Sequence, residues 1–424
     1  MQNFRFTLYF GLICAIQFAC NREPLSIPSQ APLNVLKPEI NVSVEQIKVT
    51  KATVKATVTK PGNVNILGYG CVWDTLPNPT IALSPKIEIS GKPPTGTFSF
   101  SIFGLKEKKL YYAQVYAITA KDTIYADIQT FTTKPHWTPL AVYPGGPVSG
   151  HAVFKIGDLM YAGTGYPNHT DFWAFDPALN RWTSKQSFPG AGLNAVASFE
   201  IDGTGFIGLG TDNNYQATNN FWAYNVQRDS FYRIADFPGM AREAPVEFAL
   251  NDGIGYIGFG VNTGSVGVLD DFWSYNPGTN VWDSLGKFPI GKRENAISFT
   301  LDDKAYVGFG NKSQEIYNDL WEFNPAKPWS QCWRKLTSNE PRVIAFSFSL
   351  TNGFGYVGGG IGRKDFWKFD PNKGLGGGWE RLPDLPDLLW AAAAVSMGDF
   401  AIVIGGAEGA AQNSTNKCWR YDPE

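Results

Sequence analysis

Hydrophobic and polar residues alternate along several short stretches of this chain, the pattern expected of half-buried β-strands. The alternation is clearest at residues 52–58 (ATVKATV) and 97–102 (TFSFSI). Beyond residue 150, apolar segments end in closely spaced glycines, as at Tyr256–Gly260. Such endings indicate strands that finish against a crowded neighbour, where a side chain would clash. The pattern predicts an all-β protein.

Six Trp residues recur in the second part of the chain at intervals of 46 to 52 residues. Each follows a glycine-rich strand end, and most precede an aromatic–Asp/Asn–Pro turn such as Tyr275-Asn276-Pro277. Proline fixes φ in such a turn, so the phrase indicates two strands joined tightly. A fixed period near 50 residues predicts one supersecondary unit per repeat. The six residues are Trp173, Trp222, Trp273, Trp321, Trp367 and Trp419.

The repeated phrase resembles the kelch family over about residues 136–424. This resemblance implies a six-bladed β-propeller, with one four-stranded blade per repeat and aromatic residues between the blades. Residues 391–394 (AAAA) fall where the innermost strand of the sixth blade is expected, so we do not predict a helix there. The sixth repeat ends after its third strand. We therefore expect residues 137–140 (WTPL) to supply the missing strand and close the ring.

The first twenty residues have the pattern of a bacterial export signal, with Arg5 before an apolar stretch too short to span a membrane. Cys20 follows Phe18 and Ala19, which resembles a lipoprotein lipobox, although Gln17 stands where an aliphatic residue is usual. The alternative is an ordinary cleaved signal. Lipidation would place the protein in the cell envelope, in the periplasm or at the outer membrane or cell surface. Its membrane contact would then be a lipid anchor alone.

Residues 21–35 are rich in Pro, Ser and Gln, which predicts a linker. Residues 36–134 resemble a fibronectin type III β-sandwich. The resemblance rests on Gly104-Leu105 followed by the strand-like residues 111–117, and on Trp73 as a core residue of a middle strand. A Tyr at that corner implies a structural hydrogen bond back to the chain. The propeller would then occupy residues 135–424, and we expect no chemistry in the sandwich.

The net charge and the cysteine content of the chain limit the binding partners and the cross-links that we expect. The net charge is −2, so no basic surface for nucleic acid is expected. Of five cysteines, Cys14 lies in the signal and Cys20 at the lipobox, which leaves Cys71, Cys332 and Cys418. Because Cys332 and Cys418 belong to different repeats, we expect three buried small hydrophobic residues without disulfides. We expect a monomer.

Polar segments at residues 211–218, 262–268, 311–317 and 408–415 would connect the second and third strands of their blades. The segments entering each first strand would share that face of the propeller. They bring Arg242, Arg293 and Arg342 to equivalent positions, with Val148, Leu193 and Ala391 in the other repeats. Arg near the channel mouth suits carboxylate or phosphate binding. The alternative is pairing with a neighbouring Glu or with backbone carbonyls. Asn295, Asn194, His151 and Trp390 complete the candidate ligand-binding residues.

The catalytic and metal-binding residues that the sequence contains limit which enzymes the chain can be compared with. Copper-radical oxidases also contain kelch propellers, but they need several His ligands and a Tyr–Cys pair that are missing here. No metal site or cofactor is expected. The sialic-acid mutarotases are a better comparison, since they resemble this propeller and place acid–base groups and Arg near the channel. By that resemblance Glu243 and Glu294 are candidates for proton transfer. The alternative is a solvated salt-bridge rim.

The sequence therefore supports two functions. We favour an exported, lipid-anchored binding protein that presents a propeller face to a protein or glycan ligand. The competing hypothesis is a mutarotase-like enzyme acting on an acidic sugar at the channel.

Overall fold

The computed structural model describes residues 35–424, apart from residues 168, 265, 290, 410–412 and 424. The predicted export signal, Cys20 and most of the predicted linker lie outside the described residues. Within the described part, no helix has the length and apolarity needed to cross a lipid bilayer. The structure is built almost entirely from antiparallel strands, as the alternation pattern predicts.

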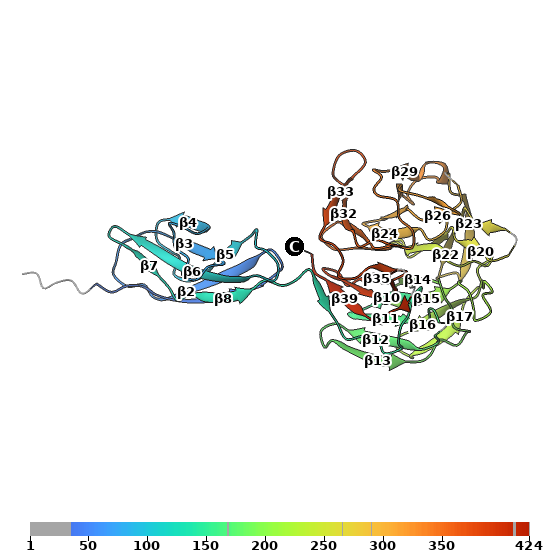
Figure 1. The fold of residues 1–424 in the computed structure, drawn as a ribbon, viewed down its shortest axis with the longest axis horizontal. Helices are drawn as coiled ribbons and strands as arrows, with labels where there is room; N and C mark the ends of the chain where they lie inside the picture. Colours follow the sequence, from blue (N-terminus) through green and yellow to red (C-terminus); the bar gives the residue numbers. More distant parts are fainter. Residues whose placement is uncertain (1–34, 168, 265, 290, 410–412, 424) are drawn as a thin grey trace, which may run out of the picture.

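The first module consists of two β-sheets packed face to face (Figure 1). One sheet has the order β1-β2-β5, with β1 (Glu39–Glu45), β2 (Ala52–Lys60) and β5 (Gly96–Ile102). The other has the order β4-β3-β6-β7, and β8 also pairs with β6. Its strands are β3 (Ile66–Asp74), β4 (Lys86–Ser90), β6 (Leu110–Thr119), β7 (Thr123–Tyr125) and β8 (Gln129–Thr132).

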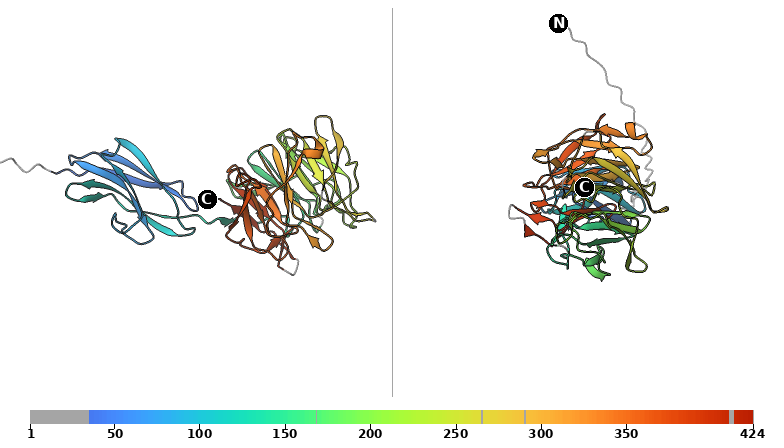
Figure 2. Two further views of the ribbon diagram at one scale, coloured as in Figure 1. Left: turned by 90° about the horizontal axis from the view of Figure 1, so that it is seen from above. Right: turned by 90° about the vertical axis from the view of Figure 1, so that its right-hand side faces the viewer.

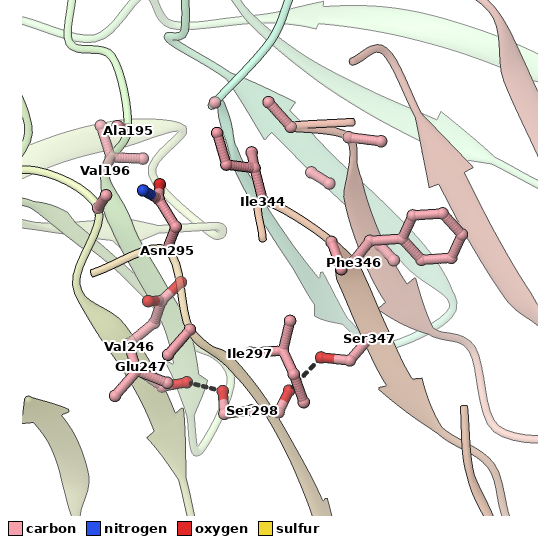
Figure 3. A pocket seen from close by; sticks show the side chains of 18 of the residues that line it. Ala195, Val196, Val246, Glu247, Asn295, Ile297, Ser298, Ile344, Phe346 and Ser347 are labelled. Atoms are coloured by element: carbon pink, nitrogen blue, oxygen red, sulfur yellow. Dashed lines mark hydrogen bonds between the residues drawn. The ribbon is translucent and has the colours of Figure 1, made fainter. Parts of the chain in front are cut away.

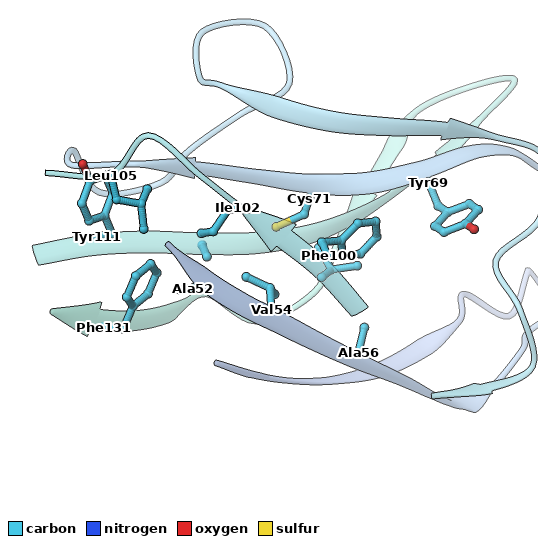
Figure 4. Close-up of a cluster of buried hydrophobic side chains, with 12 residues drawn as sticks. Ala52, Val54, Ala56, Tyr69, Cys71, Phe100, Ile102, Leu105, Tyr111 and Phe131 are labelled. Carbon is cyan, nitrogen blue, oxygen red and sulfur yellow. The ribbon is translucent and has the colours of Figure 1, made fainter. Parts of the chain in front are cut away.

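Alternate residues of β2 point into the sandwich core, where Ala52, Val54 and Ala56 are buried (Figure 4). They meet Cys71 of β3 and side chains of β5, β6 and β8.

The hydroxyl oxygen of Tyr111 accepts a hydrogen bond from the backbone N–H of Lys106 at 2.9 Å. This contact ties the start of β6 to the preceding loop and has the structural role expected of a Tyr at that corner.

The second module contains six four-stranded antiparallel sheets, the blades, which are numbered in chain order (Figures 1 and 2). Each is given with its innermost strand first. Blade 1 is β10 (Ala152–Ile156), β11 (Leu159–Gly163), β12 (Phe172–Asp176) and β13 (Arg181–Lys185). Blade 2 is β14 (Ala197–Ile201), β15 (Thr204–Gly208), β16 (Phe221–Asn225) and β17 (Ser230–Arg233). Blade 3 is β18 (Val246–Ala249), β19 (Gly255–Gly258), β22 (Asp271–Asn276) and β23 (Val281–Lys287).

The remaining blades follow the same order. Blade 4 is β24 (Ile297–Leu301), β25 (Lys304–Gly308), β28 (Leu320–Phe323) and β29 (Trp333–Lys335), with the 3-10 turn η1 (Trp329–Gln331) before its last strand. Blade 5 is β30 (Phe346–Ser349), β31 (Gly355–Gly358), β32 (Phe366–Asp370) and β33 (Gly378–Leu382). Blade 6 is β35 (Ala393–Ser396), β36 (Ala401–Ile404), β39 (Cys418–Tyr421) and β9 (Trp137–Pro139).

Short strands lie in the connections between second and third strands. They form the hairpins β20 (Val261–Asn262) with β21 (Gly267–Val268) and β26 (Asn311–Lys312) with β27 (Glu315–Ile316). In blade 6, β37 (Ala407–Glu408) and β38 (Asn413–Ser414) pair in the same connection, and β34 (Leu389–Trp390), which precedes the innermost strand, pairs with β37. The paired segments between second and third strands correspond to the polar connections expected from the sequence.

The ring closes as the sequence predicts. Innermost strands of successive blades contact one another in a circle that ends with β35 against β10. The last blade takes its outer strand from the other end of the module, because β9 pairs with β39 through Tyr421↔Trp137 and Trp419↔Pro139. Residues 393–396 form the innermost strand β35, so the alanine run is a strand entry and not a helix.

Aromatic pairs fill the spaces between blades. A Tyr or Phe on the second strand of one blade packs on a Tyr or Phe on the third strand of the next, with ring centroids 5.3 to 5.8 Å apart. Such pairs contribute more than the area they bury. The five pairs are Tyr161–Tyr224, Phe206–Tyr275, Tyr256–Phe323, Tyr306–Phe369 and Tyr356–Tyr421.

The cysteines Cys71, Cys332 and Cys418 are buried and free, as expected.

Candidate functional site

Three consecutive positions before each innermost strand repeat around the ring and organise the propeller mouth. At the first position, the backbone carbonyl accepts a hydrogen bond from a glycine at the end of a second strand in the preceding blade, as Arg293 does from Gly260. Gly260 has a φ of +93°, and a Cβ there would lie 2.7 Å from the carbonyl oxygen of Glu243. Glycine therefore ends the strand because its neighbour is crowded, as the sequence indicated. The first-position residues are all buried: Val148, Leu193, Arg242, Arg293, Arg342 and Leu389.

The hydrogen bonds correct one assignment made from spacing. The sixth equivalent of the arginines is Leu389, whose carbonyl accepts from the N–H of Gly360, and not Ala391. Ala391 lies two residues further along, at the third position of the frame. The repeats differ in length, so a fixed spacing misplaces the residue in blade 6.

The arginines lie inside their blades rather than at the channel mouth, where they were candidates for ligand binding. They pair within the fold, as the alternative stated, with backbone carbonyls and with Asp rather than Glu. Arg242, Arg293 and Arg342 are between 0% and 1% exposed. Arg242 donates to both carboxylate oxygens of Asp271 at 2.7 and 2.8 Å, and Arg293 does the same to Asp319. Each arginine also donates to a backbone carbonyl, as Arg242 does to Phe259. Most of the guanidinium donors are therefore used within the fold; among the described residues, the Nε atoms of Arg293 and Arg342 have no hydrogen-bond partner.

The acidic partners explain why the arginines turn inward. Asp271, Asp319 and Asp365 stand two residues before a repeated Trp, and the indole N–H of that Trp also donates to the carboxylate. Burial alone would raise the pKa of Asp271 and Asp319, but the hydrogen bond and charge of the arginine hold each below its usual value. Sequence reasoning missed these residues. The available signal was that Asp before Trp occurs together with Arg in blades 3, 4 and 5.

The third position of the frame forms a backbone ring around the channel. Its six residues have left-handed φ angles between 49° and 59°. Around the ring, the N–H of a residue donates to the carbonyl of its counterpart in the preceding blade, as Ala195 does to Gly150 and Ala244 does to Ala195. Five of the six are not glycine, so these bonds offset backbone strain. The backbone ring consists of Gly150, Ala195, Ala244, Asn295, Ile344 and Ala391.

The middle position of the frame points side chains into the mouth. Its backbone pairs with the connection between second and third strands, as in the bridges Glu243↔Val261, Glu294↔Asn311 and Asn194↔Thr211. The residues before and after it, at the first and third positions, are held by backbone hydrogen bonds. The side chain at the middle position can therefore face the channel axis. Six residues occupy the middle position: Ser149, Asn194, Glu243, Glu294, Val343 and Trp390.

Most of these side chains line one cavity of about 330 Å³, the mouth pocket. Sequence candidates Asn194, Asn295, Glu243, Glu294 and Trp390 come together there. The pocket also contains side chains that sequence reasoning missed. Tyr166, Val261 and Ser414 lie in connections that vary between repeats, and Ser149 occupies the middle position of the frame in blade 1.

Two carboxylates give the mouth pocket its charge. Burial raises the pKa of Glu243, while a hydrogen bond from the Thr211 hydroxyl at 3.1 Å partly offsets that rise. Burial also raises the pKa of Glu294, and the charge of Glu243 raises it further. Asn311 donates to Glu294 at 3.2 Å. The pocket thus holds two carboxyl groups that bind protons more readily than an exposed Glu.

Below the backbone ring the channel continues as a cavity of about 290 Å³ (Figure 3). One side chain per blade faces it at the same level, and these residues are Val153, Ser198, Glu247, Ser298, Ser347 and Ala394. The serine hydroxyls join neighbouring innermost strands, since Ser347 donates to the carbonyl of Ser298 at 2.7 Å. Figure 3 shows this link beside that from Ser298 to the Glu247 carbonyl.

Glu247 is the one acidic side chain that lines the channel cavity. Part of its surface opens to the channel cavity, which the six innermost strands surround. Burial raises its pKa to about 8, although the backbone N–H of Ser198 opposes that shift. The sequence offered one signal that was not used: Glu247 alternates with apolar neighbours in an innermost strand.

His151 lies in the channel wall and does not line the mouth pocket. It is 5% exposed and stacks on Tyr143 with ring centroids 6.3 Å apart. Burial lowers its pKa to about 3, so the ring is neutral at ordinary pH. Among the described residues, no group of three His, Cys, Asp or Glu side chains is arranged to hold a metal ion.

Six four-stranded sheets around a central channel define a β-propeller protein. Comparison with known proteins agrees with this class. The chain is 35% identical over 91 residues to N-acetylneuraminate epimerase of Shigella flexneri, and 34% identical over 91 residues to that of Escherichia coli K12. In both cases the match covers 20% of this chain and 24% of the relative, so it spans about a quarter of those proteins.

The solved structure of YjhT superposes with a TM-score of 0.56 at 18% sequence identity, covering 66% of this chain and 96% of that one. At this identity the likeness concerns the fold. No protein-family model matches the chain.

Proposed function

We propose that the mouth pocket binds a reducing sugar and catalyses its mutarotation. The observation that carries this proposal is the meeting of Glu243 and Glu294 in one cavity, with the pKa of each raised by burial. Mutarotation needs a base and an acid at the same time, and two coupled carboxyl groups sharing one proton supply both. The partial match to N-acetylneuraminate epimerases supports a sugar as the ligand.

The chemistry needs only proton transfers. The ionised carboxylate takes the proton of the anomeric hydroxyl, while the protonated carboxyl gives its proton to the ring oxygen. The bond between the anomeric carbon and the ring oxygen breaks, and the open-chain carbonyl forms. Rotation about the next carbon–carbon bond and the reverse transfers close the ring as the other anomer. No oxidant, metal or cofactor enters this balance.

The charge of Glu243 further raises the pKa of Glu294, so we assign Glu294 as the acid and Glu243 as the base. The Thr211 hydroxyl donates to Glu243 and stabilises its ionised form. Trp390 offers an aromatic face on the opposite part of the lining, and Asn194 and Asn295 offer amide groups for sugar hydroxyls. Aromatic faces and amides together suit a polyhydroxylated ring with apolar C–H faces.

Exchange spectroscopy by NMR tests the proposal through the rate of anomer interconversion with N-acetylneuraminate, D-glucose and D-galactose. We expect acceleration of at least one sugar by the wild-type protein. Loss of a general acid or base in Glu243→Gln or Glu294→Gln should lower the rate roughly 10²- to 10⁴-fold. The matched control is Glu315→Gln, an exposed Glu outside the lining of the mouth pocket. A folded wild-type protein that accelerates none of these sugars contradicts the proposal.

A binding protein without catalysis is the second candidate. The observation that favours it is the gathering of polar connections, such as the hairpins β20–β21 and β26–β27, around the same mouth. We propose that in this case the protein is exported and held in the cell envelope through Cys20, with the mouth presented to a protein or glycan. Retention of a glycan by both Glu243→Gln and Glu294→Gln, with no anomer exchange in the wild type, would favour this candidate.

A further inference from the structure

We infer that the mouth pocket selects a sugar that carries no carboxylate, that is, an uncharged or cationic pyranose. This inference rests on the proposed function and names its substrate class. It departs from the acidic sugar expected when the three arginines were placed at the mouth.

The charges that face the mouth pocket have one sign. Among the described residues that line it, the charged side chains are Glu243 and Glu294. The remaining polar groups are the amides of Asn194 and Asn295 and hydroxyl groups of Ser and Tyr. An anionic sugar would therefore meet at least one ionised carboxylate without a cation to balance its own charge.

The arginines cannot reverse this sign from their observed positions. Arg242 is fully buried and satisfies both oxygens of Asp271, and Arg293 binds Asp319 in the same way. Moving either guanidinium to the mouth would leave a buried carboxylate unpaired, which is strongly unfavourable. Arg242 and Arg293 thus neutralise Asp271 and Asp319, while in blade 5 Arg342 and Arg363 both contact Asp365 at 2.8 and 3.7 Å. None of these four arginines is among the described residues that line the mouth pocket.

The other described charged residues near the channel axis also favour a negative electrostatic field. Below the backbone ring, the described residues that line the channel cavity include Glu247 and His151, which burial keeps neutral, and no Lys or Arg. At the rim, Lys417 binds Asp387 and Glu408 at 3.3 and 2.8 Å, so its charge is already paired. The field along this part of the axis is thus set by carboxyl groups, and it favours a neutral or positive ligand.

The size of the effect follows from elementary electrostatics. Two like charges about 6 Å apart in a medium of effective dielectric ~20 repel enough to weaken binding roughly a hundredfold. Sharing of one proton between Glu243 and Glu294 leaves one such charge in place, because mutarotation needs one ionised carboxylate. We therefore expect at least a tenfold preference for the uncharged sugar.

The test uses pairs of sugars that share one ring and differ in the group at C6, a neutral hydroxymethyl or a carboxylate. Titrations followed by ligand-observed NMR at pH 7 compare D-glucose with D-glucuronate and D-galactose with D-galacturonate, and D-glucosamine and N-acetylneuraminate complete the set. We expect each uronate to bind at least tenfold more weakly than its neutral partner, and glucosamine to bind no more weakly than glucose. The double variant Glu243→Gln/Glu294→Gln should bring the neutral-to-uronate ratio close to one, while Glu315→Gln leaves it unchanged.

Each outcome decides the inference separately from the proposed function. Preferred binding of neutral sugars without anomer exchange supports the inference and contradicts mutarotation. Tighter binding of N-acetylneuraminate or of either uronate overturns the inference, and exchange of that sugar would then keep the proposed function. If no sugar in the set binds the folded protein, both are overturned.

Discussion

The indole of Trp137 packs against the ring of Tyr421 with ring centroids 4.9 Å apart, and the backbones of the two residues pair as neighbouring strands. Trp137 lies near the start of the propeller sequence, and Tyr421 lies three residues before residue 424. Their contact joins the two ends of the ring. Without it, blade 6 would expose the edge of β39, an unpaired row of backbone donors and acceptors.

Closure predicts a large stability effect from a short segment. Deleting residues 135–142 removes β9, with roughly four ladder hydrogen bonds at about 1 kcal/mol each and a buried Trp. We expect a marked fall in the thermal midpoint of the propeller by differential scanning calorimetry, and Trp137→Ala should produce part of that fall. Tyr232→Ala, which truncates an aromatic side chain that is 48% exposed, is the control. An unchanged midpoint in the deletion variant would contradict closure by β9.

The buried ion pairs predict a dependence on acid. The pKa of Asp271 is lowered in the folded state, so its pairing contributes stability above the unfolded value of about 3.9, and that stability is lost as pH falls through the folded pKa. Arg242→Met should cost about 3 to 5 kcal/mol at pH 7, because it leaves Asp271 buried and unpaired.

Denaturant unfolding at pH 7 and pH 3 checks this expectation. The gap between wild type and Arg242→Met should narrow at pH 3, where Asp271 can be neutralised. Arg228→Met, at an exposed position, should have little effect at either pH. A gap that stays the same at both pH values would show that the lost packing of Arg242, and not its charge, accounts for the effect.

Glu247 predicts the opposite dependence on pH. Its folded pKa of about 8 lies above the ordinary value of 4.5, so between these values the folded protein holds more protons than the unfolded chain. Stability should therefore fall as pH rises through this window, by up to about 1.4 kcal/mol per pH unit from this group. In Glu247→Gln that part of the decline should disappear. Thermal midpoints measured from pH 5 to pH 9 test it, with Glu315→Gln as the control; parallel wild-type and Glu247→Gln curves would argue against a proton held in the channel.

The backbone ring predicts how its residues tolerate substitution. Ala244 has a φ of 49° and donates its N–H to the carbonyl of Ala195. Ala244→Gly should be neutral or raise stability by about 1 kcal/mol, because glycine adopts this conformation freely. Ala244→Pro should cost more than about 3 kcal/mol, since proline fixes φ near −65° and has no N–H. Chemical denaturation distinguishes the two, and equal stability of the glycine and proline variants would contradict the role of the ring.

Much of the fold follows from the sequence because its signals are local. Glycines that end strands and Asp/Asn-Pro turns fix where strands stop, and the missing fourth strand of the last repeat pointed to Trp137. The direction of a long side chain is different. Arg242 can reach either the mouth or the blade interior, and spacing along the chain does not distinguish these. The choice depends on Asp271, which lies in another strand of the same blade and becomes a neighbour only once the sheet has formed.

The candidate site shows the same limit. Glu243, Glu294, Asn194, Asn295 and Trp390 could be named from the sequence, because they immediately precede recognisable strands. Tyr166 could not, since it lies in a connection without a repeated pattern. Glu247 was missed although its alternation with apolar residues was visible, because an acidic side chain in an innermost strand matters only when the enclosed channel is known.

The three-position frame separates what holds the propeller together from what meets a ligand. Position one is buried and position three is committed to the backbone ring, so the side chain between them bears little of the fold's stability. Six such sites occur, one per blade, and five of them line one cavity from independent segments. The mouth is thus a naturally combinatorial surface: randomising Ser149, Asn194, Glu243, Glu294, Val343 and Trp390 together offers a route to new ligand specificities on an unaltered scaffold.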